Sequence, residues 1–181
     1  MLKLNVNNET SKLLAVVLGT AKSNGPAPKL EDCYDPKSRE NVLANTYPTE
    51  IDMVDELNQL REVLVKHNVN VYRPEVINDY NQIFSRDIGF VIDDFFIVAN
   101  ILPDRSNEIF AIQKVLDLIP KNKIIELPDD CHVEGGDVIL NNDYIFIGTY
   151  DGIDYSNFKT ARTNYKSIKF LKEKFPPKTV I

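Results

Sequence analysis

The segment CHVEGGDVIL, residues 131–140, sets two acids beside two glycines at the start of an apolar run. Glu134 and Asp137 flank Gly135 and Gly136, so the backbone between the acids carries no side-chain cover. A carboxylate next to a buried strand is costly unless a cation or a hydrogen-bond donor meets it. This segment therefore raises the question of which group meets the two acids.

Outward from this segment, the chain repeats one order of elements. Residues 89–101 and 136–150 each predict two strands joined by a short polar turn. Each pair is followed by an amphipathic helix, over 105–119 and 157–175, and then by a further strand, KIIELP or KTVI. Because the same order recurs, the sequence predicts an α/β fold built from repeated units.

The first part of the chain predicts a strand, a long loop and a helix. The apolar run KLLAVVLG, residues 12–19, ends at a glycine and indicates a buried strand. Residues 20–48 lack periodicity, which is typical of a binding loop or a lid. Residues 49–68 predict an amphipathic helix with Thr49 as its N-cap and Asp52 in its first turn. The three predicted helices begin at 49, 105 and 157, a regular spacing that supports the repeat.

The repeat suggests that two of its units carry an acid at the same place. When Gly89–Ile92 is aligned with Gly136–Ile139, Asp87 falls on Glu134. If the units are arranged around one axis, these two carboxylates converge on one central place. An acid in both copies therefore indicates one shared cation.

The composition is that of one globular domain over residues 1–181. Hydrophobic residues make up 43%, charged residues 27%, and the formal net charge is -6. Nucleic acid is not an expected partner, because phosphate binding needs clustered Lys and Arg. The sequence shows neither a signal peptide at its start nor an apolar segment of membrane-spanning length. Two cysteines without a disulfide pattern predict a reducing cytoplasm.

Simpler interpretations of these residues stay open. Gly135 and Gly136 can supply a turn with unusual backbone dihedrals, whose N–H groups bind the acids. Arg86 can be a structural residue that pairs with Asp137. Arg162 can be a surface arginine near a helix N-terminus.

A metal site is a further alternative, although its spacing matches no known metal motif. Its ligands would be His132, Glu134, Asp137 and Asp87. Cys131 and Cys33 each follow two acids, which favours the thiol over the reactive thiolate. We therefore expect both cysteines to be inert and no metal to be bound.

Three segments of the chain resemble the motifs of one enzyme superfamily. NQIFSRDIGFVI, residues 81–92, resembles its N-x-x-F-[ST]-R-D motif, and HVEGGDVIL, residues 132–140, resembles its E-G-G-D-V motif. FIGTY and ARTN, within residues 146–164, resemble its I-G-x and R-T-N segments. The order and spacing agree over nearly the whole chain. The superfamily is that of arginine deiminases and amidinotransferases, the guanidine-modifying enzymes or penteins.

The resemblance implies a pentein-type β/α propeller, in which five ββαβ units surround a pseudo-fivefold axis. About three of these units fall within residues 1–181, which corresponds to the N-terminal portion of a pentein domain. Such an incomplete ring exposes strand edges and apolar faces, so we expect the chain to form a homo-oligomer.

The resemblance also implies a role for each matching residue. Asp87 and Glu134 act as the catalytic carboxylates and grip the substrate guanidinium through paired hydrogen bonds. Phe84 lies against the face of the guanidinium. The substrate's own carboxylate is held by Asn81, Arg162 and Arg105. The site is supported by Arg86, Asp137, Gly135 and Gly136.

The implied chemistry is covalent and needs no cofactor. A cysteine thiolate attacks the guanidinium carbon, an amine leaves, and water or an acceptor amine takes the amidino group. A histidine in an H-x-D segment moves the protons. The sequence up to Ile181 has no H-x-D segment, and neither cysteine lies at the expected position. We therefore expect the guanidinium cradle without its nucleophile, and no turnover by this chain alone.

The sequence predicts part of an enzyme that hydrolyses, or transfers the amidino group of, arginine or a related guanidino compound. A non-catalytic guanidine-binding or interaction module is the main alternative, and a metal-dependent hydrolase is another. The assignment requires that Asp87 and Glu134 face one hollow. A separate lysine or arginine on each carboxylate would argue against it.

Overall fold

The chain forms two compact units. The computed structural model describes residues 1–33, 36–149 and 162–181. Of these, residues 1–12, 85–149 and 162–181 make up what we call the two-hairpin unit. Residues 13–33 and 36–84 make up what we call the α2 unit. Each unit is described below by itself.

The α2 unit contains a parallel strand pair connected through a helix. Strand β1 (Ala15–Val17) pairs in parallel with β2 (Asn70–Tyr72), and α2 (Glu50–Lys66) lies between them in the chain. The Thr49 side chain accepts from the Asp52 N–H while the Asp52 carboxylate accepts from the Thr49 N–H, a complete capping box. The predicted cap is therefore confirmed.

The predicted loop of residues 20–48 is only partly irregular. It includes a 3₁₀ turn, η1 (Leu30–Asp32), and a short helix, α1 (Pro36–Leu43). Proline at the first position of α1 suits a helix start, because the N–H that proline lacks has no helical partner there.

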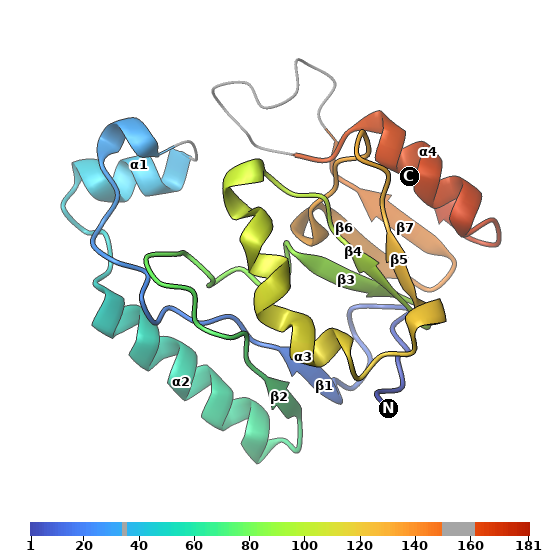
Figure 1. The fold of residues 1–181 in the computed structure, drawn as a ribbon, viewed down its shortest axis with the longest axis horizontal. Coiled ribbons are helices and arrows are strands. Elements are labelled where there is room, and N and C mark those ends of the chain that lie inside the picture. Colours follow the sequence, from blue (N-terminus) through green and yellow to red (C-terminus); the bar gives the residue numbers. More distant parts are fainter. Residues whose placement is uncertain (34–35, 150–161) are drawn as a thin grey trace. The chain divides into compact units, whose positions relative to one another are not determined.

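The two-hairpin unit contains two three-stranded sheets of the same topology (Figure 1). In the first, β3 (Gly89–Ile92) pairs antiparallel with β4 (Phe95–Val98), which pairs in parallel with β5 (Ile124–Glu126). In the second, β6 (Val138–Asn141), β7 (Tyr144–Ile147) and β8 (Thr179–Val180) repeat this order. The hairpin, helix and strand order predicted twice from the sequence is confirmed.

The register of the hairpins corrects the alignment on which the converging acids were based. Ile92 pairs with Phe95 at the end of the first hairpin, and Asn141 pairs with Tyr144 at the end of the second. The equivalent of Ile92 is thus Asn141, and not Ile139. By the same register, Asp87 corresponds to Gly136 rather than to Glu134. The two acids do not occupy equivalent positions of the repeat.

The helices of this unit are shorter than predicted. The first helical segment runs as a 3₁₀ helix, η2 (Pro103–Ile112), before one α-helical turn, α3 (Gln113–Leu116). The last helix, α4 (Tyr165–Lys174), begins after Asn164, whose side chain accepts from the Ser167 N–H. The predicted start at 157 lies outside the described residues, and 162–164 are not helical. Two further 3₁₀ turns are η3 (Lys121–Lys123) and η4 (Gly135–Asp137).

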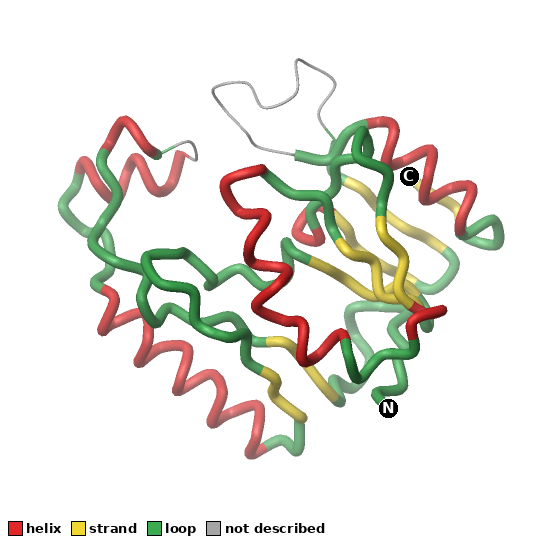
Figure 2. Tube along the Cα trace, viewed as in Figure 1, coloured by secondary structure: helices red, strands yellow, loops and turns green. Residues whose placement is uncertain are grey.

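The core of the two-hairpin unit lies between the first sheet, the second sheet and α4. Alternate residues of β3, β6 and β7 are the more buried ones, as expected for strands with one face on a core. Helix α4 lies along the second sheet (Figure 2) and contributes Leu171, and its C-cap residue Phe175 also belongs to the core. The buried members of this core are Phe90, Ile92, Ile97, Val133, Val138, Leu140, Ile145, Ile147, Leu171 and Phe175.

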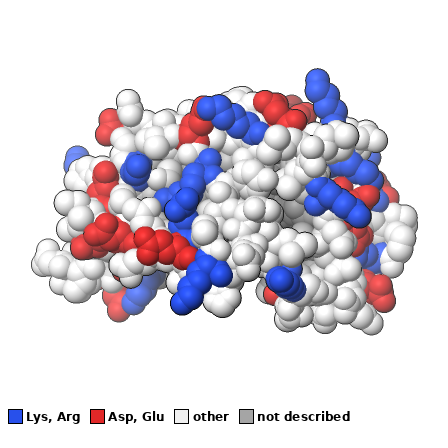
Figure 3. Space-filling view, turned by 90° about the horizontal axis from the view of Figure 1, so that it is seen from below, with Lys and Arg blue, Asp and Glu red and all other residues white. Residues whose placement is uncertain are grey.

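The surface carries mixed charge. On the face presented in Figure 3, Lys and Arg side chains alternate with Asp and Glu rather than forming one basic patch. Within the described part of the chain, none of the helices combines the length and the apolar character needed to cross a membrane.

Candidate functional site

The loop that carries Asp87 and the loop that carries Glu134 come into contact at Gly135 and Gly136. The Gly135 N–H donates to the Asp87 carbonyl at 3.2 Å, and Arg86 Nε donates to the Gly135 carbonyl at 2.9 Å. A Cβ atom on Gly135 would lie 2.0 Å from the Arg86 carbonyl oxygen, and one on Gly136 would lie 2.7 Å from Asp87 Oδ1. Gly135 is therefore needed for the close approach of the two backbones, whereas the atom nearest to Gly136 is the end of a side chain. The predicted unusual dihedrals are wrong, because neither glycine has a positive φ.

Each of the two predicted catalytic carboxylates is paired with an arginine. Arg162 Nη2 lies 2.6 Å from Glu134 Oε2, and Arg105 Nη1 lies 2.8 Å from Asp87 Oδ2. Arg105 also pairs with Glu108 through its Nε, at 2.6 Å. The expectation that no separate arginine binds each acid is therefore wrong, which counts against the assignment made from the sequence: a guanidinium ligand can bind both acids only where it displaces these arginines. In this structure the arginines predicted to hold a substrate carboxylate hold the chain's own carboxylates instead.

The Glu134 carboxylate is buried and incompletely hydrogen-bonded. Its side chain is 3% exposed. Among the residues that the structure describes, none donates a hydrogen bond to Glu134 Oε1. A buried carboxylate oxygen in this state is costly unless a further donor arrives.

Asp87 and Glu134 lie close enough for their charges to affect each other. Burial raises the pKa of Glu134 to about 7, against the opposing effect of the Arg162 guanidinium. The negative charge of Asp87 raises the same pKa further, which requires that the two acids lie near each other. For Arg105, burial acts to lower the pKa, but the carboxylates of Glu108 and Asp87 raise it above its usual value.

Asp137 supports the site through the segment that carries Arg162. Its Oδ2 accepts from the Arg162 backbone N–H at 3.0 Å and from Thr163 Oγ1 at 2.7 Å. The predicted pairing of Asp137 with Arg86 is wrong. The Arg86 guanidinium donates instead to two backbone carbonyls and to Glu9.

Two predicted site residues belong to the α2 unit. Asn81 Oδ1 accepts from the Ile83 N–H at 3.1 Å, and the Phe84 ring is 58% exposed. Their proposed contacts with substrate therefore stay predictions. The structure brings together the charged members of the set, namely Arg86, Asp87, Arg105, Glu134, Asp137 and Arg162.

Sequence reasoning missed three residues of this network. Glu108 is 1% exposed and lies one helical turn after Arg105, so its position in the sequence could have indicated the pair. Thr163 donates to Asp137, and its place in the R-T-N segment was a usable signal. Glu9 pairs with Arg86 across 77 positions of the chain, and no local pattern indicates such a contact.

The cysteine and metal alternatives gain no support from the described residues. Cys131 is buried, and burial together with the charge of Asp130 raises the pKa of its thiol, which favours the unreactive form. Across residues 1–33, 36–149 and 162–181, no three His, Cys, Asp or Glu side chains are grouped so that they could hold a metal ion.

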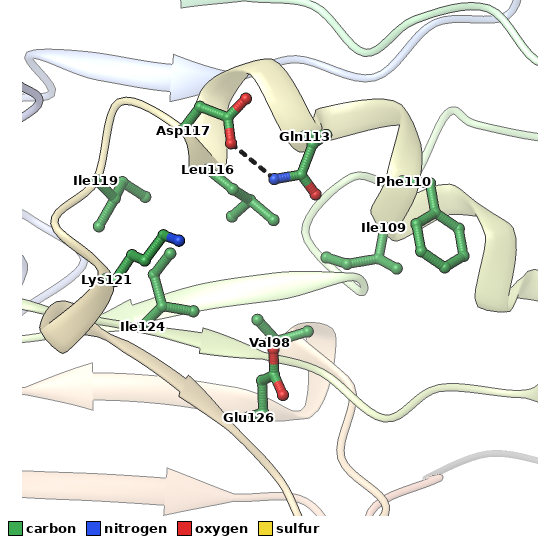
Figure 4. A pocket seen from close by; sticks show the side chains of 10 residues that line it. All are labelled: Val98, Ile109, Phe110, Gln113, Leu116, Asp117, Ile119, Lys121, Ile124 and Glu126. Atoms are coloured by element: carbon green, nitrogen blue, oxygen red, sulfur yellow. Dashed lines mark hydrogen bonds between the residues drawn. The ribbon is translucent and has the colours of Figure 1, made fainter.

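A separate hollow of about 630 Å³ lies between the η2–α3 segment and strands β4 and β5 (Figure 4). On the side of this hollow that the η2–α3 segment forms, Gln113 Nε2 donates to Asp117 Oδ1 at 2.8 Å. None of the predicted site residues lines it, so it is distinct from the paired carboxylates. Its lining consists of Val98, Ile109, Phe110, Gln113, Leu116, Asp117, Ile119, Lys121, Ile124 and Glu126.

The sequence is similar to one curated protein and matches no family model. The curated protein is the uncharacterized protein YkgA of Bacillus subtilis (strain 168), which is 30% identical over 131 residues. The match covers 70% of this chain but only 41% of YkgA.

Several solved structures share the fold at low sequence identity. The SxtG amidinotransferase of Microseira wollei, from a saxitoxin biosynthetic pathway, superposes with a TM-score of 0.70 at 19% identity, over 97% of this chain and 61% of that one. The dimethylarginine dimethylaminohydrolase of Pseudomonas aeruginosa, in complex with citrulline, gives 0.61 at 15% identity, over 93% and 60%. The N-terminal domain of ArgZ, a cyanobacterial arginine dihydrolase bound to its substrate, gives 0.67 at 13% identity, over 93% and 56%.

These neighbours agree in fold while differing in reaction. The chain spans less than two thirds of the length of each. It therefore has the fold of the pentein superfamily, to which these guanidine-modifying enzymes belong.

Proposed function

We propose that the chain binds a guanidino compound at Asp87 and Glu134, as part of an enzyme that hydrolyses or transfers its amidino group. One observation carries this proposal: Glu134 Oε1 is buried and lacks a donor among the described residues, beside a second carboxylate. A guanidinium is flat, cationic and rich in N–H donors, and it can meet both acids at once. The names of the structural neighbours identify them as an amidinotransferase, a dimethylarginine dimethylaminohydrolase and an arginine dihydrolase.

Binding requires that ion pairs are exchanged. Arg162 forms an ion pair with Glu134, and Arg105 forms one with Asp87. An incoming guanidinium competes with the Arg162 side chain for Glu134, and a carboxylate on the ligand can then pair with the displaced Arg162 guanidinium. A ligand with both groups, such as arginine, replaces each lost pair with a new one. A ligand without a carboxylate displaces Arg162 from Glu134 without offering it a new ion pair.

The chemical step is proposed from the resemblance alone. A thiolate adds to the guanidinium carbon, an amine leaves with a proton, and water or an acceptor amine then releases the amidino group from sulfur. Asp87 and Glu134 keep the guanidinium charged and in place, which makes its carbon electrophilic. The raised pKa of Cys131 argues against that thiol as the nucleophile. We therefore propose that residues 1–181 supply the cradle and do not turn over substrate alone.

The second candidate is a guanidine-binding module without catalysis. It is favoured by the same observation on Cys131, since a binder needs the carboxylates but no thiolate. The two candidates make the same prediction for ligand binding and differ in product formation.

The second sheet offers a surface for the expected self-association. Ile139, Tyr144 and Phe146 are exposed on its outer face, and the Tyr144 and Phe146 rings stack with centroids 6.2 Å apart. By the hairpin register, their equivalents in the first sheet include Phe90 and Ile97, which are buried in the core. We therefore propose that this outer face contacts a second copy of the chain.

Isothermal titration calorimetry with L-arginine tests the binding proposal. We expect saturable binding by the wild type and loss of binding in Glu134→Gln, which keeps the shape but removes the charge. Glu173→Gln, an exposed acid of α4, is the matched control and should bind like the wild type. Equal affinity of the wild type and Glu134→Gln would contradict the proposal. Product analysis with arginine then separates the enzyme from the binder.

A further inference from the structure

The N-terminal segment of the two-hairpin unit crosses the turns of both hairpins. Val6 and Asp93, in the first turn, exchange two backbone hydrogen bonds of 2.8 and 2.7 Å. In the second turn, the Asn142 N–H donates to the Asn7 carbonyl at 2.7 Å. Residues 5–9, which we call the strap, therefore tie the two hairpins to each other at one end.

The strap ends at Glu9, which contacts Arg86, next to Asp87, and strand β6, which follows the loop of Glu134. Glu9 Oε1 accepts from Arg86 Nη2 at 3.0 Å and from the Leu140 N–H at 3.3 Å. Arg86 also donates to the carbonyls of Gly135 and Val138, at 2.9 and 2.7 Å. Arg86 therefore lies on the loop of Glu134, and Glu9 holds its guanidinium there.

The sequence neighbours of these contacts are the site residues themselves. Arg86 immediately precedes Asp87, and Gly135 immediately follows Glu134. Rotation of the Arg86 side chain away from the second loop would remove its two hydrogen bonds to that loop and leave the bond from the Gly135 N–H to the Asp87 carbonyl, at 3.2 Å, to hold the two backbones. A displacement of about 1 Å at such a site is enough to weaken a bidentate contact strongly.

We propose that Glu9 is a positioning residue, which acts through Arg86 to fix the spacing between Asp87 and Glu134. Its consequence for ligand affinity rests on the proposed guanidinium function, but the geometric claim does not. The Arg86 and Glu9 side chains are 46% and 37% exposed. An ion pair this open contributes little to global stability, so its effect is expected in the site rather than in the fold.

Glu9→Ala is the test, because it removes both contacts of the Glu9 carboxylate. Glu9→Gln keeps an acceptor oxygen and serves as the conservative variant. Glu31→Ala, which removes an acid that is 77% exposed and lies in the α2 unit, is the control. The ligand-free readout is the titration midpoint of the Glu134 carboxyl, followed by carbon-detected NMR on selectively labelled protein. The second readout is the Kd for L-arginine from calorimetry.

We expect Glu9→Ala to move the Glu134 midpoint toward its ordinary value by about half a pH unit or more, because a loosened loop admits water. We expect the Kd for arginine to rise about tenfold. Glu9→Gln should keep the Glu134 midpoint and the Kd for arginine close to their wild-type values. Glu31→Ala should change neither the midpoint nor the Kd.

The outcomes separate this inference from the proposed function. If the wild type binds no arginine, the proposed function fails, while the midpoint still tests the positioning role. If Glu9→Ala leaves the Glu134 midpoint unchanged, the positioning role is overturned, whatever happens to the unfolding temperature. The same holds if Glu31→Ala shifts the midpoint as far as Glu9→Ala does.

Discussion

Arg162 Nη2 lies 2.6 Å from Oε2 of Glu134, so this carboxylate is paired with a guanidinium that belongs to the chain itself. The pair is largely removed from water, with the two side chains 20% and 3% exposed. The Arg162 guanidinium thus makes with Glu134 the kind of contact that is proposed for the guanidinium of a ligand. It also means that a ligand has to compete with Arg162 for the carboxylate.

Removal of Arg162 should change ligand preference in opposite directions for two ligands. Arg162→Met removes the partner of an incoming carboxylate, so arginine is expected to bind about tenfold more weakly or worse. Agmatine has a guanidinium without a carboxylate, and it loses a competitor, so its affinity is expected to hold or to rise. Calorimetry measures the Kd of the wild type and of Arg162→Met for each of the two ligands. A parallel loss for both would show that Arg162 serves the site only by holding its structure.

Arginine affinity should rise with pH, because guanidinium binding needs the ionised Glu134. Its carboxyl has a pKa of about 7 in the empty site, so below that pH a proton must leave on binding. The affinity is expected to rise about tenfold per pH unit between about 5.5 and 7, and to level off above. Calorimetry in two buffers of different ionisation enthalpy detects the released proton. A flat profile would count against Glu134 as the binding carboxylate.

The raised pKa of Glu134 also predicts the direction in which the free energy of unfolding changes with pH. The folded chain keeps a proton on Glu134 that the unfolded chain releases above its ordinary value of 4.5. The contribution of Glu134 to the free energy of unfolding therefore falls as the pH rises from about 4.5 to about 7. Urea denaturation of wild type and Glu134→Gln at several pH values measures it. As the pH rises, the free energy of unfolding of Glu134→Gln should increase relative to that of the wild type.

Gly135→Ala should be strongly destabilising. The new Cβ would lie 2.0 Å from the Arg86 carbonyl oxygen, a backbone atom that cannot move aside without separating the two loops. A loss of about 2 kcal/mol or more in the free energy of unfolding is expected from urea denaturation. Gly148→Ala is the matched control, because its Cβ would meet its neighbours at 3.7 Å or more. Similar losses for both variants would mean that close approach at Gly135 is not special.

The outer face of the second sheet should mediate self-association. Phe146→Ser removes a stacked ring from this face without touching the core, since Phe146 is 39% exposed. Sedimentation velocity is expected to show an oligomer for the wild type and a shift to monomer for the variant. Leu43→Ser, at an exposed position in the α2 unit, is the control. A monomeric wild type at high concentration would refute the proposed contact.

The hairpins and the first helix cap could be predicted because their signals are local. Apolar alternation fixes which residues of a strand share a face, and Thr49 with Asp52 fixes a helix start. The repeat was also visible, but its register was not. Two extra residues around Gly135 shift the motif relative to the hairpin, and only the pairing of Asn141 with Tyr144 reveals this.

The contacts of the site depended on long-range packing that no local pattern encodes. The motifs predicted Asp87, Glu134 and Asp137 for one site because each lies in a short recognisable segment, and the structure places the three carboxylates near one another. The pairing of Glu134 with Arg162 and of Arg86 with Glu9 could not be foreseen, because each joins segments far apart in the chain. A charged side chain has several acceptors within reach, and the fold decides among them.

The most direct test is a crystal structure of the chain with L-arginine. The account predicts the ligand guanidinium between the carboxylates of Asp87 and Glu134, with Glu134 Oε1 accepting a hydrogen bond from it. It also predicts that Arg162 has turned from Glu134 to the ligand carboxylate. Arginine bound elsewhere, or bound while the ion pair of Arg162 and Glu134 stays intact, would contradict the account.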